Sequence, residues 1–157
     1  MTAGKRTAFS LVELVIVVVF IGILAAISVP RLKFSAISKY KAEATAKKIV
    51  TDLRRTRGLA ICDAANNPTN GYGIMMNGPS SSYTSYTIWN RATWEIVDSH
   101  TIDPDITVSN TNSPYFRFGP LGNLLDGSDT QLTVSDGGKT FTITVIRATG
   151  MIKCSEN

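Results

Sequence analysis

The stretch from Phe9 to Pro30 contains one ionisable side chain, Glu13, in an otherwise apolar run. A helix that rises about 1.5 Å per residue would cover roughly 30 Å between Phe9 and Val29, which is the thickness of a bilayer's hydrocarbon core. An acidic side chain in lipid is unfavourable by about 2.5 to 3.5 kcal/mol at mid-helix, and by less near an end. The stretch therefore predicts a single transmembrane helix over residues 9–30, whose carboxylate needs a partner.

A short basic leader precedes this helix. The run Lys5-Arg6-Thr7-Ala8, followed by Phe9-Ser-Leu-Val-Glu13 and the apolar tail, resembles the leader and N-terminus of type IV pilins and type II secretion pseudopilins. In that family a prepilin peptidase cuts on the cytoplasmic side, directly before the Phe, and methylates the new amino terminus. The resemblance implies a leader over residues 1–8, cleavage between Ala8 and Phe9, N-methylation of Phe9 and a role for Glu13 in subunit assembly.

Two details qualify the resemblance. The family usually has Gly before the cut, where this chain has Ala8. Pro30, in contrast, falls where the family also carries Pro, and it predicts a kink at the membrane exit because it lacks an amide proton and crowds the preceding turn. An ordinary signal peptide or signal anchor is the alternative, with Leu24-Ala25-Ala26 as a weak cleavage site, although Glu13 interrupts its apolar core.

An amphipathic helix is predicted over residues 31–61. Its expected buried face recurs every three to four residues, at Ile37, Tyr40, Ala44, Ile49, Leu53 and Ala60. Between Arg31 and Arg57 nine Lys or Arg residues stand against only Glu43 and Asp52. Counted alone, these charges would place the segment in the cytoplasm. The pilin resemblance implies the periplasm instead.

Beyond this helix the pattern predicts a β-rich domain over residues 62–157. Short β-type runs alternate with turn residues, at 72–76, 83–89, 93–97, 106–109, 115–118, 131–135, 140–146 and 151–154. Asp136-Gly-Gly-Lys139 predicts a tight hairpin, because glycine accepts the positive φ that such turns demand. The fold class is therefore α+β, with a long N-terminal helix packed on an antiparallel β domain.

A second, shorter resemblance covers the C-terminal third. Phe116-Arg-Phe-Gly-Pro-Leu-Gly122, a hairpin, and Ala148-Thr-Gly-Met-Ile152 resemble the tail of the H-type (GspH-like) minor pseudopilins and of FimT/FimU-like minor pilins. The alternative is that Pro and Gly in this segment only form the turns of an ordinary β domain.

Two distant cysteines, Cys62 and Cys154, are a possible disulfide in a periplasmic domain, since that compartment is oxidising. Two separate buried thiols are the alternative. Closing a loop of this length would stabilise the fold by roughly 4 to 5 kcal/mol at most.

No catalytic set is recognisable, so the chain is not expected to be an enzyme. It has one histidine, His100, and its acids are scattered mainly in turns. Asp103-Pro-Asp105 and Asp126-Gly-Ser-Asp129 lack the spacing of a calcium loop and are interpreted as turns. We expect no metal and no cofactor.

Nucleic acid is the competing partner. The basic helix and four aromatic residues, Tyr83, Tyr86, Trp89 and Trp94, offer phosphate contacts and stacking surfaces. Some FimT-like minor pilins bind DNA through an arginine-containing stretch near the C-terminus, but the corresponding tail here, Gly150-Met-Ile-Lys153, has one basic residue. A solvated helix face in a filament is favoured, and nucleic acid is not an expected partner.

The resemblance implies a minor pseudopilin of type II secretion, held in the inner membrane by a single span with its C-terminal domain in the periplasm. The implied partners are other pseudopilins or pilins in a short filament, the prepilin peptidase, the inner-membrane assembly platform and the lipid bilayer. A FimT/FimU-like minor type IV pilin, active in pilus assembly or DNA uptake, is the alternative. A signal-anchored binding protein is a third.

Overall fold

The structure, a computed structural model, describes residues 10–28, 34–110 and 112–157. The chain forms two compact units, Met1–Phe34 and Ser35–Asn157. Ala8, Phe9 and Pro30 lie outside the described residues, so the cleavage junction and the kink stay predictions.

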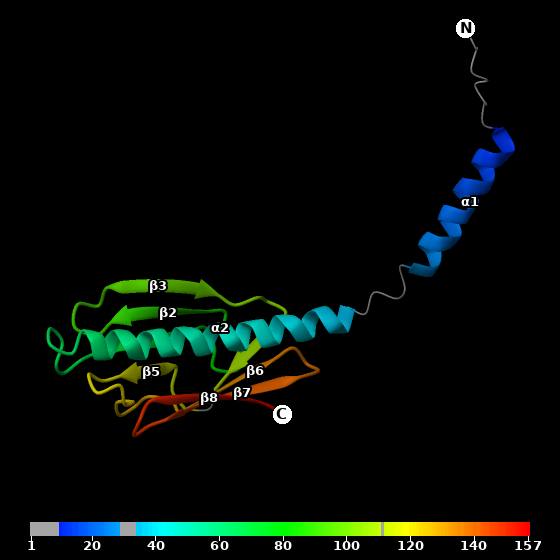
Figure 1. The fold of residues 1–157 in the computed structure, drawn as a ribbon. Coiled ribbons are helices and arrows are strands. Elements are labelled where there is room, and N and C mark those ends of the chain that lie inside the picture. The colour runs from blue at the N-terminus through cyan, green and yellow to red at the C-terminus, as the bar shows by residue number, and fades with distance from the viewer. Residues whose placement is uncertain (1–9, 29–33, 111) are drawn as a thin grey trace, which may run out of the picture. The chain divides into compact units, whose positions relative to one another are not determined.

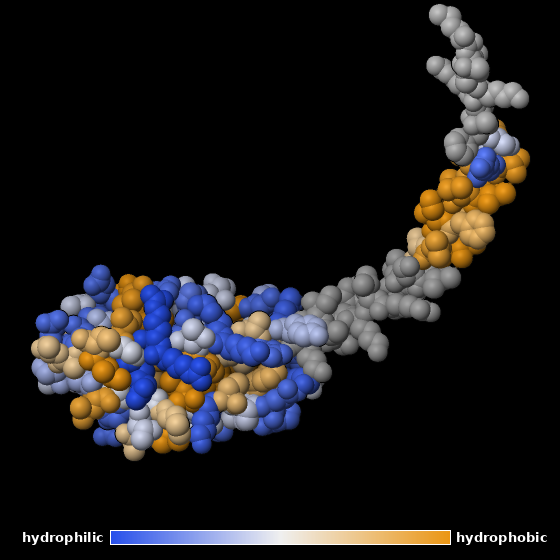
Figure 2. Space-filling view, in the orientation of Figure 1, coloured by the Kyte–Doolittle hydropathy of each residue, from blue (hydrophilic) through white to orange (hydrophobic). Residues whose placement is uncertain are grey.

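Helix α1 (Leu11–Ser28) is the described part of the first unit, and Glu13 lies in its first turn. Its large apolar side chains between Leu11 and Leu24 expose 49% to 79% of their surface. Figure 2 displays this helix as a nearly continuous apolar surface. Among the residues that the structure describes, no helix combines the length and the apolarity that crossing a membrane requires. The membrane span over residues 9–30 therefore stays a prediction.

Helix α2 (Phe34–Cys62) packs on the β domain through one stripe of side chains. The stripe consists of buried residues spaced by three, four or seven positions, namely Ala42, Ala46, Ile49, Leu53 and Ala60, with Val50 beside it. The sequence placed Tyr40 and Ala44 on this face, which is wrong, since both are exposed. At about 100° per residue, Tyr40 and Ala44 fall on the side of the helix opposite Ile49, whereas Ala42 and Ala46 continue its stripe.

In the described part of the chain, eight strands form two antiparallel sheets. The first has the order β3-β2-β1-β5, from β1 (Tyr72–Asn77), β2 (Ser85–Asn90), β3 (Ile96–Thr101) and β5 (Tyr115–Phe118). The second has the order β4-β6-β7-β8, from β4 (Thr107–Ser109), β6 (Gln131–Ser135), β7 (Thr140–Ile146) and β8 (Met151–Glu156). Helix α2 runs along the domain between the β2–β3 side and the β7–β8 side (Figure 1).

One core joins the helix to both sheets. Alternate strand residues point into it, including Ile74 and Met76, Tyr86 and Ile88, Phe116 and Phe118, Leu132 and Val134, and Phe141, Ile143 and Val145. This alternation follows from the two-residue period of a strand. The α+β class is confirmed, as is the packing of the helix on an antiparallel β domain.

Most predicted strands agree with the structure, but β3 begins three residues later than the sequence suggested. The predicted run over 93–97 is interrupted because Trp94 adopts a positive φ of 61°. Its amide donates to the carbonyl of Asn90 (2.9 Å), and the amide of Asn90 donates to the carbonyl of Glu95 (2.9 Å). These bonds close the β2–β3 loop. The turn before β7 is as predicted, with Gly137 at φ 85° and the Asp136 carboxylate accepting from the amides of Gly138 and Lys139 (2.8 Å each).

The glycines of the second resemblance bring two loops into contact. Gly150 has a φ of 63°, and a Cβ there would lie 1.8 Å from the carbonyl oxygen of Gly122. Arg57 of α2 binds both loops, since Nε donates to the Gly122 carbonyl (3.1 Å) and Nη2 to the Thr149 carbonyl (3.0 Å). The end of α2 is therefore tied to the turn that leads into β8.

A matched pair of glycine substitutions tests this contact. Gly150→Ala adds a methyl group against backbone at a positive φ, and should lower the free energy of unfolding by more than about 2 kcal/mol. Gly137→Ala meets the same conformational strain with nothing within 4 Å of the added atom, and should cost only about 1 kcal/mol. Denaturant unfolding of both variants measures the difference. Equal losses would show that the two loops do not approach as described.

Candidate functional site

The predicted assembly residues are only partly described. Glu13 is exposed in the first turn of α1 and is the single ionisable residue of that helix. A carboxylate at a helix N-terminus is electrostatically favourable, because the macrodipole is positive at that end. The other predicted N-terminal residues, Ala8, Phe9 and Pro30, lie outside the described residues, so their placement relative to Glu13 stays a prediction.

The two cysteines are apart and unbonded. Cys62 ends α2, and Cys154 lies on β8; both are free and exposed. Cys154 lines a small cavity together with Ala46 and Lys47, in the middle of α2. Lys47 and Cys62 are separated by roughly 22 Å of helix axis, whereas a disulfide needs Cα atoms within about 7 Å. The predicted bridge is therefore not formed in this structure, and the alternative of two buried thiols is not observed either.

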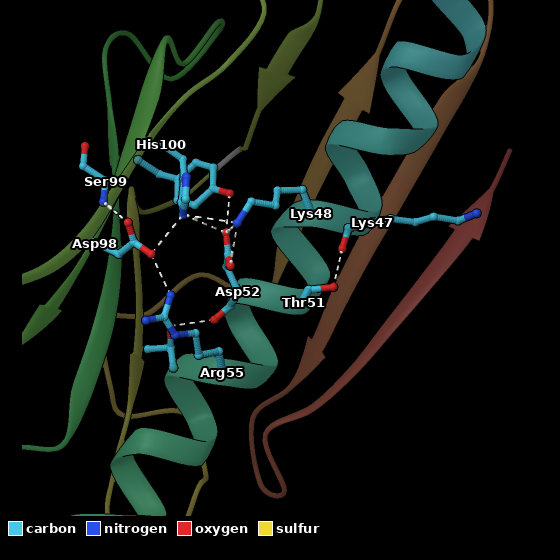
Figure 3. Close-up of polar contacts among 10 residues, drawn as sticks. Lys47, Lys48, Thr51, Asp52, Arg55, Asp98, Ser99 and His100 are labelled. Atoms are coloured by element: carbon cyan, nitrogen blue, oxygen red, sulfur yellow. Dashed lines mark hydrogen bonds and ion pairs between the residues drawn. The ribbon is translucent and has the colours of Figure 1, made fainter.

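A polar cluster joins α2 to β2 and β3 (Figure 3). At its centre lies Asp52, a residue that is only 2% exposed. It accepts hydrogen bonds from the Tyr86 hydroxyl (2.6 Å) and from Lys48 Nζ (3.0 and 3.1 Å). Burial raises the pKa of the Tyr86 phenol far above its ordinary value, and the neighbouring Asp52 carboxylate adds to this. The phenol thus stays protonated and donates to Asp52.

His100 lies between two carboxylates of the same cluster. Its Nε2 is 3.5 Å from Asp52 and 3.3 Å from Asp98. Arg55 Nη1 donates to Asp98 (2.6 Å), and this bond lowers the pKa of the Asp98 carboxyl. Since the folded-state pKa is depressed, Asp98 stabilises the fold above its ordinary pKa of about 4, and this contribution is lost as the pH falls through the lower value.

The sequence predicted a solvated basic face on α2. The structure differs in part, because some of these basic side chains form ion pairs with acids. Lys48 pairs with Asp52 of the same helix and Arg55 pairs with Asp98 of β3, so neither is a free charge. At the start of the helix, Lys41 forms ion pairs with Asp103 (3.0 Å) and Asp105 (2.8 Å). The sequence did contain a signal for this cluster, because an acid, Asp52, stands four residues after Lys48 in a mostly basic helix.

The two acidic segments weighed as calcium loops are turns. In the first, the Ile106 amide donates to the Asp103 carbonyl (2.9 Å), and Lys41 binds both carboxylates. In the second, Gly127 has a φ of 72°. Asp129 is 1% exposed and accepts from backbone amides, including that of Thr130 (2.6 Å). Both carboxylate sets therefore have structural partners.

The four aromatic residues weighed for stacking on nucleic acid do not form one surface. Tyr83 and Tyr86 are buried in the core. Trp89 and Trp94 instead stack on each other, with ring centroids 4.8 Å apart, and line a cavity on the face of the first sheet that points away from α2. We call this cavity the outer-sheet groove. Its lining residues are Met75, Asn77, Thr87, Trp89, Trp94, Ile96, Tyr115 and Arg117.

Comparison with known proteins supports the fold. Among solved structures, the type IV minor pilin FimU of Pseudomonas aeruginosa (strain PAO1) matches with a TM-score of 0.58 and 14% sequence identity. The match covers 72% of this chain and 91% of that one. No family model and no curated protein matches the chain. At this identity the likeness establishes a pilin-like fold and nothing finer.

Substitutions at two acids of α2 test how much the polar cluster contributes to the stability of the fold. Asp52→Asn removes the buried charge that faces Lys48 and Tyr86, and should lower the free energy of unfolding by about 2 kcal/mol. Glu43→Gln is the control, because Glu43 pairs with Lys47 across one helical turn at the surface, a contact worth about 0.5 kcal/mol or less. Urea unfolding at neutral pH compares the variants, and similar losses would mean that the cluster does not hold α2 on the sheet.

Proposed function

We propose that this chain is a pilin-like filament subunit, anchored in the inner membrane by its N-terminal helix, with its β domain in the periplasm. The observation that carries the proposal is the combination of an exposed apolar helix bearing one early acid, Glu13, with a pilin-like domain in the same chain. We assign the subunit a structural role in assembly and no catalytic role.

The exposed apolar surface of α1 supports a lipid or filament environment. A helix that is hydrophobic all round is normally buried, in a membrane or among other helices. Before assembly, lipid would cover these side chains, and within a filament the helices of neighbouring subunits would do so. The proposed span covers residues 9–30, and α1 accounts for residues 11–28 of it.

Cleavage before Phe9 would supply a partner for Glu13. The cut creates a positively charged amino terminus, which the Glu13 carboxylate of a neighbouring subunit would neutralise. In a low-dielectric setting the two charges attract strongly, but desolvation offsets much of this gain. The pair is therefore better suited to setting the register between subunits than to adding a large net stability.

Within this role we favour a minor pseudopilin of the type II secretion system, which assembles into a short periplasmic filament for protein export. A minor type IV pilin is the second candidate, favoured by the likeness to FimU. Deleting the gene for this chain distinguishes the two candidates. Loss of export of folded proteins supports the pseudopilin, whereas loss of surface pili with normal export supports the minor type IV pilin.

Glu13 variants test the assembly role. Glu13→Ala makes α1 more apolar, so it should still be cut and found in the membrane, yet it should fail to cross-link to other pilin-like subunits because a neighbour's amino terminus is left unpaired. Glu13→Gln should fail in the same way, whereas Glu13→Asp keeps the charge and should retain part of the cross-linking. Leader cleavage, membrane fractionation and cross-linking are compared with wild type, and a Glu13→Ala chain that cross-links normally would refute the pairing.

A further inference from the structure

The outer-sheet groove is a cavity of about 600 Å³, a size typical of cavities that hold small molecules. Its floor is one row of paired, outward-facing residues, namely Thr87 of β2, Met75 of β1 and Tyr115 of β5. Asn77 stands on the same face of β1, two residues after Met75, and lines one end of the groove. A ligand in the groove would therefore lie on the outer face of three neighbouring strands.

Two stacked tryptophans form the other end of the groove. Trp89 of β2 and Arg117 of β5 pair with Gly73 of β1 from its two sides, and a Cβ on Gly73 would lie only 3.0 Å from Trp89 Nε1. Trp94 stacks on Trp89, with ring centroids 4.8 Å apart, yet it is 74% exposed. Ile96 pairs with Trp89 and is also exposed. The groove thus has an aromatic and aliphatic wall that the domain leaves open to solvent.

Trp94 holds its position at a conformational cost. Its φ of 61° makes it the single non-glycine residue with a positive φ in the part of the chain that the structure describes. A bulky side chain is unfavourable in this conformation. The bond from the Trp94 amide to the Asn90 carbonyl helps to hold it there. Strained residues of this kind gather at binding sites, so the exposed indole is a candidate contact for a ligand.

Three polar side chains of the groove make no hydrogen bond within the part of the chain that the structure describes. They are the amide of Asn77 and the hydroxyls of Thr87 and Tyr115, all on partly exposed residues. An amide and a hydroxyl can each donate and accept hydrogen bonds. The three groups are therefore available to a ligand that carries several hydroxyls.

The charge of the groove favours a neutral ligand. Of its described lining residues, Arg117 alone is charged. Arg117 Nη2 donates to the carbonyl of Asp126 (2.9 Å), and the guanidinium lies over the Tyr115 ring, with Cζ 5.4 Å from the ring centroid. The described lining has no acid to attract a cation, and its one cation already has a hydrogen-bond acceptor and an aromatic partner.

We propose that the outer-sheet groove binds a neutral sugar ring of a glycan. A pyranose ring combines an apolar face of C–H groups, which packs against aromatic side chains, with hydroxyls around its edge. In the groove the C–H face packs against Trp94, and the hydroxyls pair with Asn77, Thr87 and Tyr115. The site lies within the folded domain and does not depend on the proposed filament role.

Two other classes of ligand fit the groove less well. An aromatic compound without hydroxyls would remove water from the three polar side chains and leave them without partners, which lowers affinity. Single-stranded nucleic acid needs a row of cations along its backbone beside the stacking rings, whereas the described lining offers Arg117 alone. Benzoate and oligothymidylate therefore serve as competing probes.

Intrinsic fluorescence provides a local readout, since both tryptophans of the chain line the groove. The full chain is kept in a detergent without a sugar headgroup and is titrated with maltose, cellobiose, lactose and N,N′-diacetylchitobiose. We expect a saturable emission change with at least one of these disaccharides, with a dissociation constant of about 1 mM or lower. Added salt should leave the affinity unchanged, because the ligand carries no charge.

Two variants and one control locate the binding site. Trp94→Gly suits the positive φ, so it should unfold like wild type yet bind about tenfold more weakly. Thr87→Val keeps the shape of the side chain and removes the hydroxyl, and should weaken binding about fivefold. Thr144→Val makes the same change on β7 of the second sheet and should leave binding unchanged.

Three results would overturn the proposal. The first is that no disaccharide gives a saturable change. The second is that folded Trp94→Gly and Thr87→Val chains bind the disaccharides as tightly as wild type. The third is that benzoate or oligothymidylate binds more tightly than every disaccharide.

Discussion

The packing of α2 against two separate sheets is the interaction on which the domain depends. Each sheet has four strands and one apolar face, and the helix buries both faces through Ile49 and Leu53, which are at most 1% exposed. The alanines at the start of the stripe, Ala42 and Ala46, leave little side chain between helix and strands. Without α2 both faces would lie open to water, at a cost of about 25 cal/mol per Å² of apolar surface.

Polar contacts then fix where the helix lies. Asp52 binds Tyr86 of β2, and Arg57, five residues further along the helix, binds carbonyls of the β5–β6 and β7–β8 loops. A buried carboxylate such as that of Asp52 is costly unless it is paired, so it tolerates only a narrow range of positions. Several basic side chains of α2 therefore stabilise the fold of the chain itself, which is why they are weak support for a nucleic-acid surface.

Local patterns predicted much of the domain, but contacts between distant segments did not follow from them. Alternation and glycine turns located the strands, including β6 and β7 around Asp136, because these signals lie within a few residues of each other. The pairing of Arg55 with Asp98 and the meeting of Trp89, Gly73 and Arg117 depend on sheet order and register, which no local pattern encodes. For the same reason, no local pattern could show that Cys62 and Cys154 lie apart and unbonded.

The pilin-like account makes its most specific claim at the N-terminus. The direct measurement is the intact mass, with sequencing of the first residues, of the chain extracted from membranes of cells that contain the processing machinery. The account predicts a mature chain that begins at N-methylated Phe9, with residues 1–8 removed. A chain that still begins at Met1, or one that begins near Ala26, would contradict it and leave a signal anchor or an ordinary secreted domain in its place.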